Sequence, residues 1–213
     1  MYLHDRDPFS AELDACIQSL EPIPGVCILI DVIDSVADKY RPPERQWIKK
    51  LNNTFNFISL INRFSEYLVK GIGDEILLYI PLTAFQADRP YPTVFSLLAE
   101  LRSTMATLRE HPFPQLFYPC KIGLHLCFDV YNISFVPHTN DYYGRDIDVV
   151  CRLMKKATAG EIVLSETLYQ HIVDESRAFP EQTPALLPRC GKTVKEAFKG
   201  VPEPVAYRLL TID

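Results

Sequence analysis

The sequence lacks the features typical of membrane, exported and nucleic-acid-binding proteins. None of its 213 residues belong to an unbroken apolar run near the ~18 residues of a transmembrane helix, and the longest run, Val26 to Ile33, is interrupted by Asp31. The N-terminus has no basic-then-apolar signal. The net charge is −5 and the pI about 5.6, whereas a nucleic-acid binder usually presents a basic face. We therefore expect a cytoplasmic protein that binds neither membrane nor nucleic acid.

Paired cysteine motifs are also missing. The six cysteines form no C-x-x-C pair, and Cys27 and Cys127 lie in apolar, strand-like runs that favour buried free thiols. We expect a reducing environment, with neither disulfides nor zinc. The chain contains no internal repeat and no low-complexity segment.

The pattern that is present indicates one α+β domain behind a short extension. Residues 1–24 read as the extension, with a helix over 10–20, and residues 25–213 read as the domain. Strands are predicted over 26–30, 66–70, 75–80, 120–130, 161–164 and 205–210, and helices over 42–61, 94–110, 144–157 and 166–172. This order predicts a ferredoxin-like βαββαβ core with an antiparallel sheet, followed by extra C-terminal strands.

Two aspartates stand where strands end. Asp31 is late in an apolar strand, and Asp74 lies at the tip of the hairpin around Gly71 to Asp74. Neighbouring strand ends can bring two carboxylates together, and such a pair repels unless a divalent cation lies between them. Two metal ions about 3.5–4 Å apart can activate a hydroxyl and stabilise a leaving phosphate. The alternative is that Asp31 only caps the turn after its strand.

Four sequence blocks, taken in order, resemble the class III adenylyl/guanylyl cyclase family. They are residues 28–35, residues 69–76 with their Lys-x-x-Gly-Asp pattern, residues 121–125 continuing through 141–144 to Asp148 and Arg152, and residues 160–166 followed by 198–200. The likeness covers about residues 25–210. It implies an enzyme that converts a nucleoside triphosphate into a 3′,5′-cyclic nucleotide and pyrophosphate, using two Mn²⁺ or Mg²⁺ ions.

The resemblance also implies roles for individual residues in the metal and phosphate sites. Asp31 and Asp74 would hold both metal ions, with the carbonyl of Val32 as a further ligand. Arg152 would stabilise charge on the phosphates in the transition state, and Lys199 would bind the terminal phosphates. The 3′-hydroxyl would attack the α-phosphate in line, so positioning and charge neutralisation would supply most of the catalysis.

The base would be read by Lys70 and Asp141, which match the purine pattern of the family. Each assignment has a simpler alternative. In these alternatives, Lys70 is a solvent-exposed lysine on a strand, Asp141 is a turn residue, and Lys199 is part of a surface turn. Arg152 is then the partner of Asp148, one helical turn away.

The sequence departs from the family at two places near the nucleotide. Asp148 stands where the family usually has an Asn that orients the ribose, so it contacts the substrate differently, helps with metal, or slows turnover. Residues 126–131 are bulky and contain none of the chain's 8 glycines, which indicates a remodelled loop and leaves U, C and A open as the base. His125 reads as a core or dimer-face histidine rather than a catalyst.

The family places its active site between two domains, so a single-domain chain is expected to work as a homodimer with two equivalent sites. The Gly-Asp-Glu and Tyr-Gly-x-Asp-Ile-Asp signatures resemble the bacterial pyrimidine cyclases of Pycsar antiviral defence. These make cyclic UMP or cyclic CMP, which activates a separate effector.

Three other functions compete with a pyrimidine cyclase. An adenylate cyclase making cAMP fits Lys70 and Asp141. A diguanylate cyclase fits residues 71–76 but has no counterpart for residues 141–152. A nucleotide-binding pseudo-cyclase fits Asp148 but leaves both metal acids unexplained.

Overall fold

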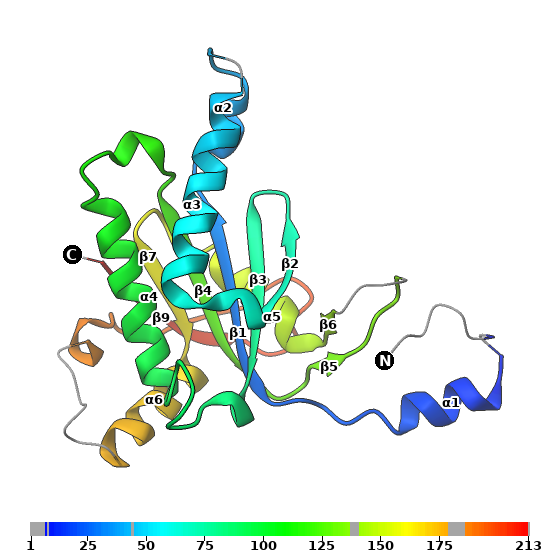
Figure 1. The fold of residues 1–213 in the computed structure, drawn as a ribbon. Coiled ribbons are helices and arrows are strands. Elements are labelled where there is room, and N and C mark those ends of the chain that lie inside the picture. The colour runs from blue at the N-terminus through cyan, green and yellow to red at the C-terminus, as the bar shows by residue number, and fades with distance from the viewer. Residues whose placement is uncertain (1–6, 8, 44, 137–140, 179–185, 213) are drawn as a thin grey trace.

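The computed structural model describes residues 7, 9–43, 45–136, 141–178 and 186–212 (Figure 1). Its strands are β1 (Gly25–Val32), β2 (Leu68–Ile72), β3 (Glu75–Pro81), β4 (Cys120–Cys127), β5 (Tyr131–Asn132), β6 (Tyr142–Tyr143), β7 (Glu161–Ser165), β8 (Val194–Glu196) and β9 (Val205–Thr211). Its α-helices are α1 (Ala11–Gln18), α2 (Ser35–Lys39), α3 (Gln46–Asn62), α4 (Val94–Arg109), α5 (Arg145–Met154) and α6 (Glu166–Ala178). In the part of the chain that these ranges cover, no helix is long and apolar enough to cross a bilayer.

The sheet has seven strands in the order β2-β3-β1-β4-β7-β9-β8. Its first four strands are antiparallel, and α3 and α4 form the two crossovers, which is the ferredoxin-like arrangement that the sequence predicts. The C-terminal strands extend this core at the β4 edge. The sheet is mostly antiparallel rather than wholly so, because β7 runs parallel to β4.

Both faces of the sheet are covered, which explains why β1 is almost continuously apolar. Val26, Ile28 and Ile30 point toward α3, α4 and α6 in the large core. Cys27 and Leu29 point to the opposite face, where Val150 and Met154 of α5 cover them. Cys27 and Cys127 are buried free thiols, as predicted.

Some elements differ from the prediction. The hairpin turns at Gly73 and Asp74, where Gly73 adopts a φ of +67° that suits glycine. The aromatic segment after β4 contains the small β5–β6 sheet. The elements α2 and β8 have no sequence counterpart, because 5 and 3 residues are too few for a hydrophobic period to be recognised. Residues 178–192, whose prolines predict a loop, lie partly outside the described residues.

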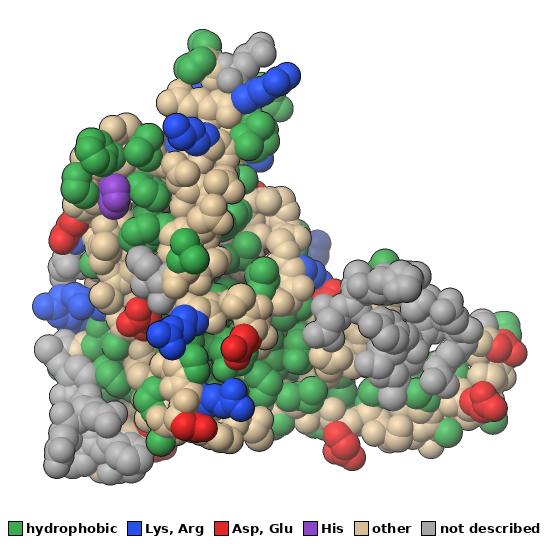
Figure 2. Space-filling view, viewed as in Figure 1, with side chains coloured by type: hydrophobic (Ala, Val, Ile, Leu, Met, Phe, Trp, Pro, Cys, Tyr) green, Lys and Arg blue, Asp and Glu red, His purple; other side chains and the backbone are tan. Residues whose placement is uncertain are grey.

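The N-terminal helix α1 stands away from the sheet (Figure 1) and has no buried residue. Ser10 caps it by accepting a hydrogen bond from the backbone N–H of Leu13 at 3.2 Å. The division into an extension over 1–24 and a catalytic domain over 25–213 stays a prediction. On the face shown in Figure 2, Lys and Arg side chains are scattered among acidic and apolar ones.

Candidate active site

Acidic side chains gather where β1 ends. By strand alternation Asp31 lies on the α5 face, and its register partners are Glu75 on β3 and Lys121 on β4. The Nζ atom of Lys121 is 3.1 Å from Oδ2 of Asp31. The strand therefore delivers one carboxylate, with a cation beside it, to the edge of the core.

Asp74 is fixed next to this strand end by the hairpin. The backbone N–H of Val32 donates to the carbonyl oxygen of Asp74 at 3.3 Å, and the hydroxyl of Ser35 donates to the Asp74 carboxylate. Burial, and then the negative charges of Asp31 and Asp74, raise the pKa of Glu75. Asp31 and Asp74 thus both lie close enough to act on Glu75, which joins a site for which the sequence indicated only two carboxylates.

This oxygen-rich group suits a hard divalent cation. Two neighbouring carboxylates repel a third and oppose its ionisation. A cation that binds among the three removes this repulsion. The ligand atoms of the three acids do not all lie within 4.8 Å of one another. Among the described side chains, those of His125, Cys127 and Asp146 do. A cation at the acids would therefore also need the Val32 carbonyl, water or substrate phosphates, which is the usual pattern for Mg²⁺.

Lys70 and Asp141 form an ion pair. Nζ of Lys70, on β2, is 2.6 Å from Oδ2 of Asp141, which lies just before β6 and is 7% exposed. The backbone N–H of Tyr142 donates to the other carboxylate oxygen at 2.8 Å, and the Lys70 ammonium lies 5.1 Å from the centre of the Tyr143 ring. The two predicted base-reading residues are therefore neighbours, although 71 positions separate them.

Helix α5 carries Asp148 and Arg152 and is held close to β4 and the loop after it by two glycines. A Cβ on Gly144 would lie 1.9 Å from the carbonyl oxygen of Asp129. A Cβ on Gly123 would lie 2.9 Å from Cβ of Met154. Both contacts leave room only for hydrogen, so Gly123 sets the distance between the helix and β4, and Gly144 lets the helix begin against the loop that follows β4.

Asp146 anchors the first turn of α5. Its Oδ2 accepts hydrogen bonds from the backbone N–H groups of Phe128 at 2.6 Å and Asp129 at 2.8 Å. Burial opposes its ionisation, but hydrogen bonds from His125 and from these two N–H groups lower the pKa of Asp146 to about 2. His125 is buried, as expected of a core histidine, and sequence reasoning did not connect it with Asp146.

Arg152 and Lys199 belong to a second group of residues. Nη2 of Arg152 is 3.8 Å from the position that a Cβ on Gly200 would take, so the guanidinium reaches the turn that carries Lys199. Lys199 is exposed, and so is Asp148. Nε of Arg152 is buried and has no hydrogen-bond partner among the described residues. No ion pair between Arg152 and Asp148 is found among them.

In the described part of the chain, the two groups share a neighbour, because Glu75 and Arg152 both influence the pKa of Cys151, but they make no direct bond. Across the described residues, no hydrogen bond or ion pair joins Asp31 or Asp74 to Arg152 or Lys199. Each group presents part of what a phosphate-transfer site needs: carboxylates for cations in one, and cationic side chains for phosphate oxygens in the other.

No protein-family model matches this sequence, and no curated protein matches it. Solved structures do match. The guanylyl cyclase Cya2 superposes with a TM-score of 0.67 and 17% identity, over 91% of this chain and 99% of that one. The adenylyl cyclase CyaB from P. aeruginosa gives a TM-score of 0.63 and 20% identity, over 90% and 96%.

The chain has the class III nucleotidyl cyclase fold. A third structure with this fold, the guanylate cyclase domain of RhGC from Catenaria anguillulae in complex with GTP, matches with a TM-score of 0.58 and 15% identity, over 89% of this chain and 96% of that one. At these identities the likeness establishes the cyclase fold, and a function has to be argued from the side chains that the fold positions.

Proposed function

We propose that this protein is a nucleotidyl cyclase that converts a nucleoside triphosphate into the 3′,5′-cyclic nucleotide and pyrophosphate. The observation that carries the proposal is that the cyclase fold brings Asp31 and Asp74 to one strand end, where both act on Glu75. A fold shared with adenylyl and guanylyl cyclases, one of them in complex with GTP, supports the same reaction class.

In the proposed site, two divalent cations, Mn²⁺ or Mg²⁺, would supply Lewis acidity for the 3′-hydroxyl and neutralise the phosphates. Asp31, Asp74 and the Val32 carbonyl would hold them. Lys121, which pairs with Asp31, also places a cation where phosphate oxygens would arrive. The 3′-oxygen attacks the α-phosphorus, its proton leaves to water, and the bond to the β-phosphate oxygen breaks to release pyrophosphate.

Arg152 and Lys199 would stabilise the charge that develops on the phosphates. The Arg152 guanidinium has a buried Nε without a partner, so a phosphate oxygen would satisfy a donor that the single chain leaves unpaired. Its planar fork suits two oxygens of one phosphate. Asp148, exposed one turn earlier on α5, would contact the ribose in this proposal, where an anion accepts hydrogen bonds from hydroxyls.

We infer a homodimer because, among the described residues, no hydrogen bond or ion pair joins the acidic group to Arg152 or Lys199. A two-fold axis would bring the acids of one protomer to the cations of its partner and would create two equivalent sites. Mixing inactive variants tests this directly. Asp74→Ala and Arg152→Ala should each be inactive alone, and their equimolar mixture should recover about a quarter of wild-type activity, because half the dimers then contain one intact site.

A mixture that stays inactive, although subunits exchange, would place both groups in one chain and refute the shared site. Asp88→Ala offers a matched control, since Asp88 is an exposed aspartate in the loop before α4. It should leave activity unchanged alone and in mixtures.

Within this class we infer a pyrimidine substrate, UTP or CTP, with the product acting as a second messenger for a separate effector in antiviral defence. The support is the bulky segment over 126–131 and Asp148 in place of the usual Asn. The Lys70–Asp141 ion pair favours the alternative, an adenylate cyclase, because it presents one donor and one acceptor side by side.

One assay separates these functions. Pure protein is incubated with ATP, GTP, CTP or UTP and Mn²⁺, and products are identified by chromatography and mass spectrometry. A cyclic UMP or cyclic CMP product supports the pyrimidine proposal, and a product from ATP alone refutes it. A pseudo-cyclase would give no product from any of the four, and Asp74→Ala would leave its nucleotide binding unchanged.

A further inference from the structure

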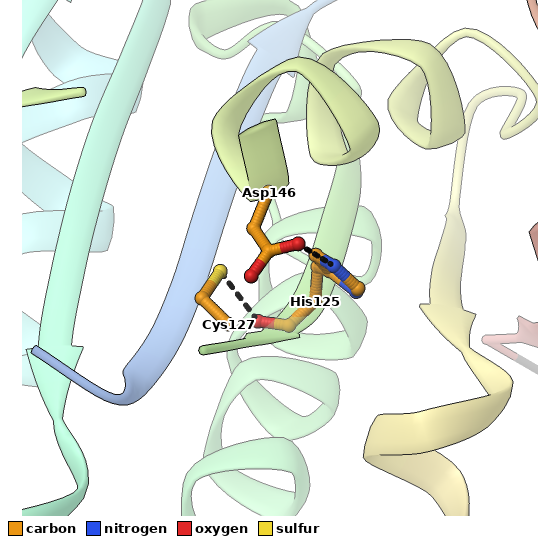
Figure 3. Close-up of side chains that lie close together, drawn as sticks. All are labelled: His125, Cys127 and Asp146. Carbon is orange, nitrogen blue, oxygen red and sulfur yellow. Dashed lines mark hydrogen bonds and ion pairs between the residues drawn. The ribbon is translucent and has the colours of Figure 1, made fainter. Parts of the chain in front are cut away.

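Three potential metal ligands of different chemistry meet beside β4, away from the proposed catalytic acids. His125 and Cys127 are two residues apart on β4 and therefore lie on the same face of the strand, and Asp146 comes from the first turn of α5 (Figure 3). One ligand atom from each residue lies within 4.8 Å of the other two. The sequence indicated no zinc because it lacks paired cysteines, and spacing alone does not reveal a set drawn from a strand and a distant helix.

The hydrogen bonds leave this set incomplete. His125 is 7% exposed; one ring nitrogen, Nε2, lies 3.4 Å from Oδ1 of Asp146, and the other, Nδ1, is buried without a partner among the described residues. The Cys127 thiol is fully buried; it donates a long contact of 3.6 Å to the carbonyl oxygen of His125, and its other neighbour is the thiol of Cys27. Buried polar atoms are normally paired, so an unpaired imidazole nitrogen calls for an explanation.

The two oxygens of the Asp146 carboxylate have different partners. Both backbone bonds, from Phe128 and Asp129, go to Oδ2. Oδ1 is paired with His125 alone, and Figure 3 shows the Asp146 carboxylate between the Cys127 and His125 side chains. The arrangement therefore brings an oxygen, a nitrogen and a sulfur donor together in one buried cluster.

We infer that His125, Cys127 and Asp146 form a binding site for one zinc-type divalent cation. Sulfur and imidazole donors select borderline-soft ions such as Zn²⁺ over Mg²⁺ and Ca²⁺, which prefer oxygen. On binding, the Cys127 thiol would lose its proton to solvent as the S–Zn bond forms. The thiolate and the carboxylate then offset the two positive charges, and the imidazole is neutral, so the buried site carries no net charge.

The ion would link β4 to the start of α5. In the proposed function that helix carries Asp148 and Arg152, so an ion at its first turn would fix the position of both. This regulatory part rests on the proposed function, whereas the binding of the ion does not.

The site can be tested with Co²⁺ as a spectroscopic probe on the full chain after treatment with a chelator. We expect one Co²⁺ per chain with a near-ultraviolet thiolate-to-cobalt charge-transfer band that Zn²⁺ displaces, together with a higher melting temperature in Zn²⁺. Cys127→Ser should abolish the band, and Asp146→Asn should weaken Co²⁺ binding at least about tenfold. Cys190→Ser, at a partly buried thiol near β9, is the matched control and should change neither.

Absence of the band in folded wild-type protein, or a band that persists in Cys127→Ser, would overturn the inference. If Cys127→Ser does not fold, His125→Gln replaces it, with a loss of affinity expected and unchanged affinity as the contrary result. The double variant Asp31→Asn, Asp74→Asn should keep the band while losing cyclase activity. Failure of this site and failure of the proposed function are therefore separate outcomes.

Discussion

The contact between α5 and β4 at Gly123 gives a quantitative prediction. In Gly123→Ala, the new Cβ would lie 2.9 Å from Cβ of Met154 and 3.2 Å from its Cα and backbone nitrogen. None of these atoms can rotate away, so the helix itself has to move from the sheet. Overpacking of this kind costs ~1–3 kcal/mol.

For a chain of this size, a loss of ~2 kcal/mol lowers the melting temperature by roughly 4–8 °C. Chemical denaturation with a circular dichroism readout gives the free energy of unfolding directly. Gly71→Ala is the control, because the nearest atom to its new Cβ is 3.9 Å away and no loss of stability is expected. If the proposed function is right, Gly123→Ala also slows turnover, since α5 carries Arg152.

A second substitution, at Met154, tests which atoms cause the clash. Trimming Met154 to Ala keeps the Cβ and backbone atoms that cause the clash, so Gly123→Ala combined with Met154→Ala should be no more stable than Gly123→Ala alone. Full rescue by Met154→Ala, or a stability of Gly123→Ala equal to that of Gly71→Ala, would refute the close seating of the helix on β4.

Three other changes test hydrogen bonds and an ion pair elsewhere in the fold. Thr54→Val should cost ~1–3 kcal/mol of unfolding free energy, because the buried Thr54 hydroxyl accepts the backbone N–H of Tyr118 at 2.8 Å and valine leaves that donor unpaired; equal denaturation midpoints would contradict this. Thr93→Ala should cost ~1 kcal/mol by removing the cap of α4, measured in the same way, with Thr93→Ser nearly neutral. The pKa of Glu166 is lowered mainly by its hydrogen bond from Arg208, so its contribution to stability is present at pH values above the unfolded pKa and is lost as pH falls through the folded value. Denaturation at neutral and at acidic pH should therefore show a smaller acid-induced loss in Glu166→Gln than in wild type, and identical losses would rule this contribution out.

Much of the core fold follows from local pattern. The continuous apolar run of β1 predicts a strand buried on both faces, and the spacing of Trp47, Leu51 and Phe55 predicts α3. The order of these elements was sufficient for the ferredoxin-like core. The short elements α2, β5, β6 and β8 escaped prediction because each has too few residues to show a period.

The residues of the candidate site were named from the sequence one by one, and the approach of Asp31 to Asp74 was the main part of their arrangement that the strand order indicated. Asp31 and Asp74 stand out because an acid in or beside an apolar strand is unusual, and Lys70 and Asp141 stand out through the family pattern. The roles given to these residues, and to Arg152, Asp148 and Lys199, stay predictions. Glu75 and Lys121 lie inside the matched sequence blocks but received no role, because the charge of a single strand residue does not show which neighbour it meets.

The sequence by itself determined which segments become strands and helices, because backbone propensity and the burial of one face act over a few neighbouring residues. Only the tertiary structure decided which side chains meet: Lys70 with Asp141, Glu75 with Asp31, and His125 with Asp146. Such contacts depend on strand register and on how closely α5 packs on β4. That distance is set by the missing side chain of Gly123, whose effect appears only once the helix and the sheet are in contact.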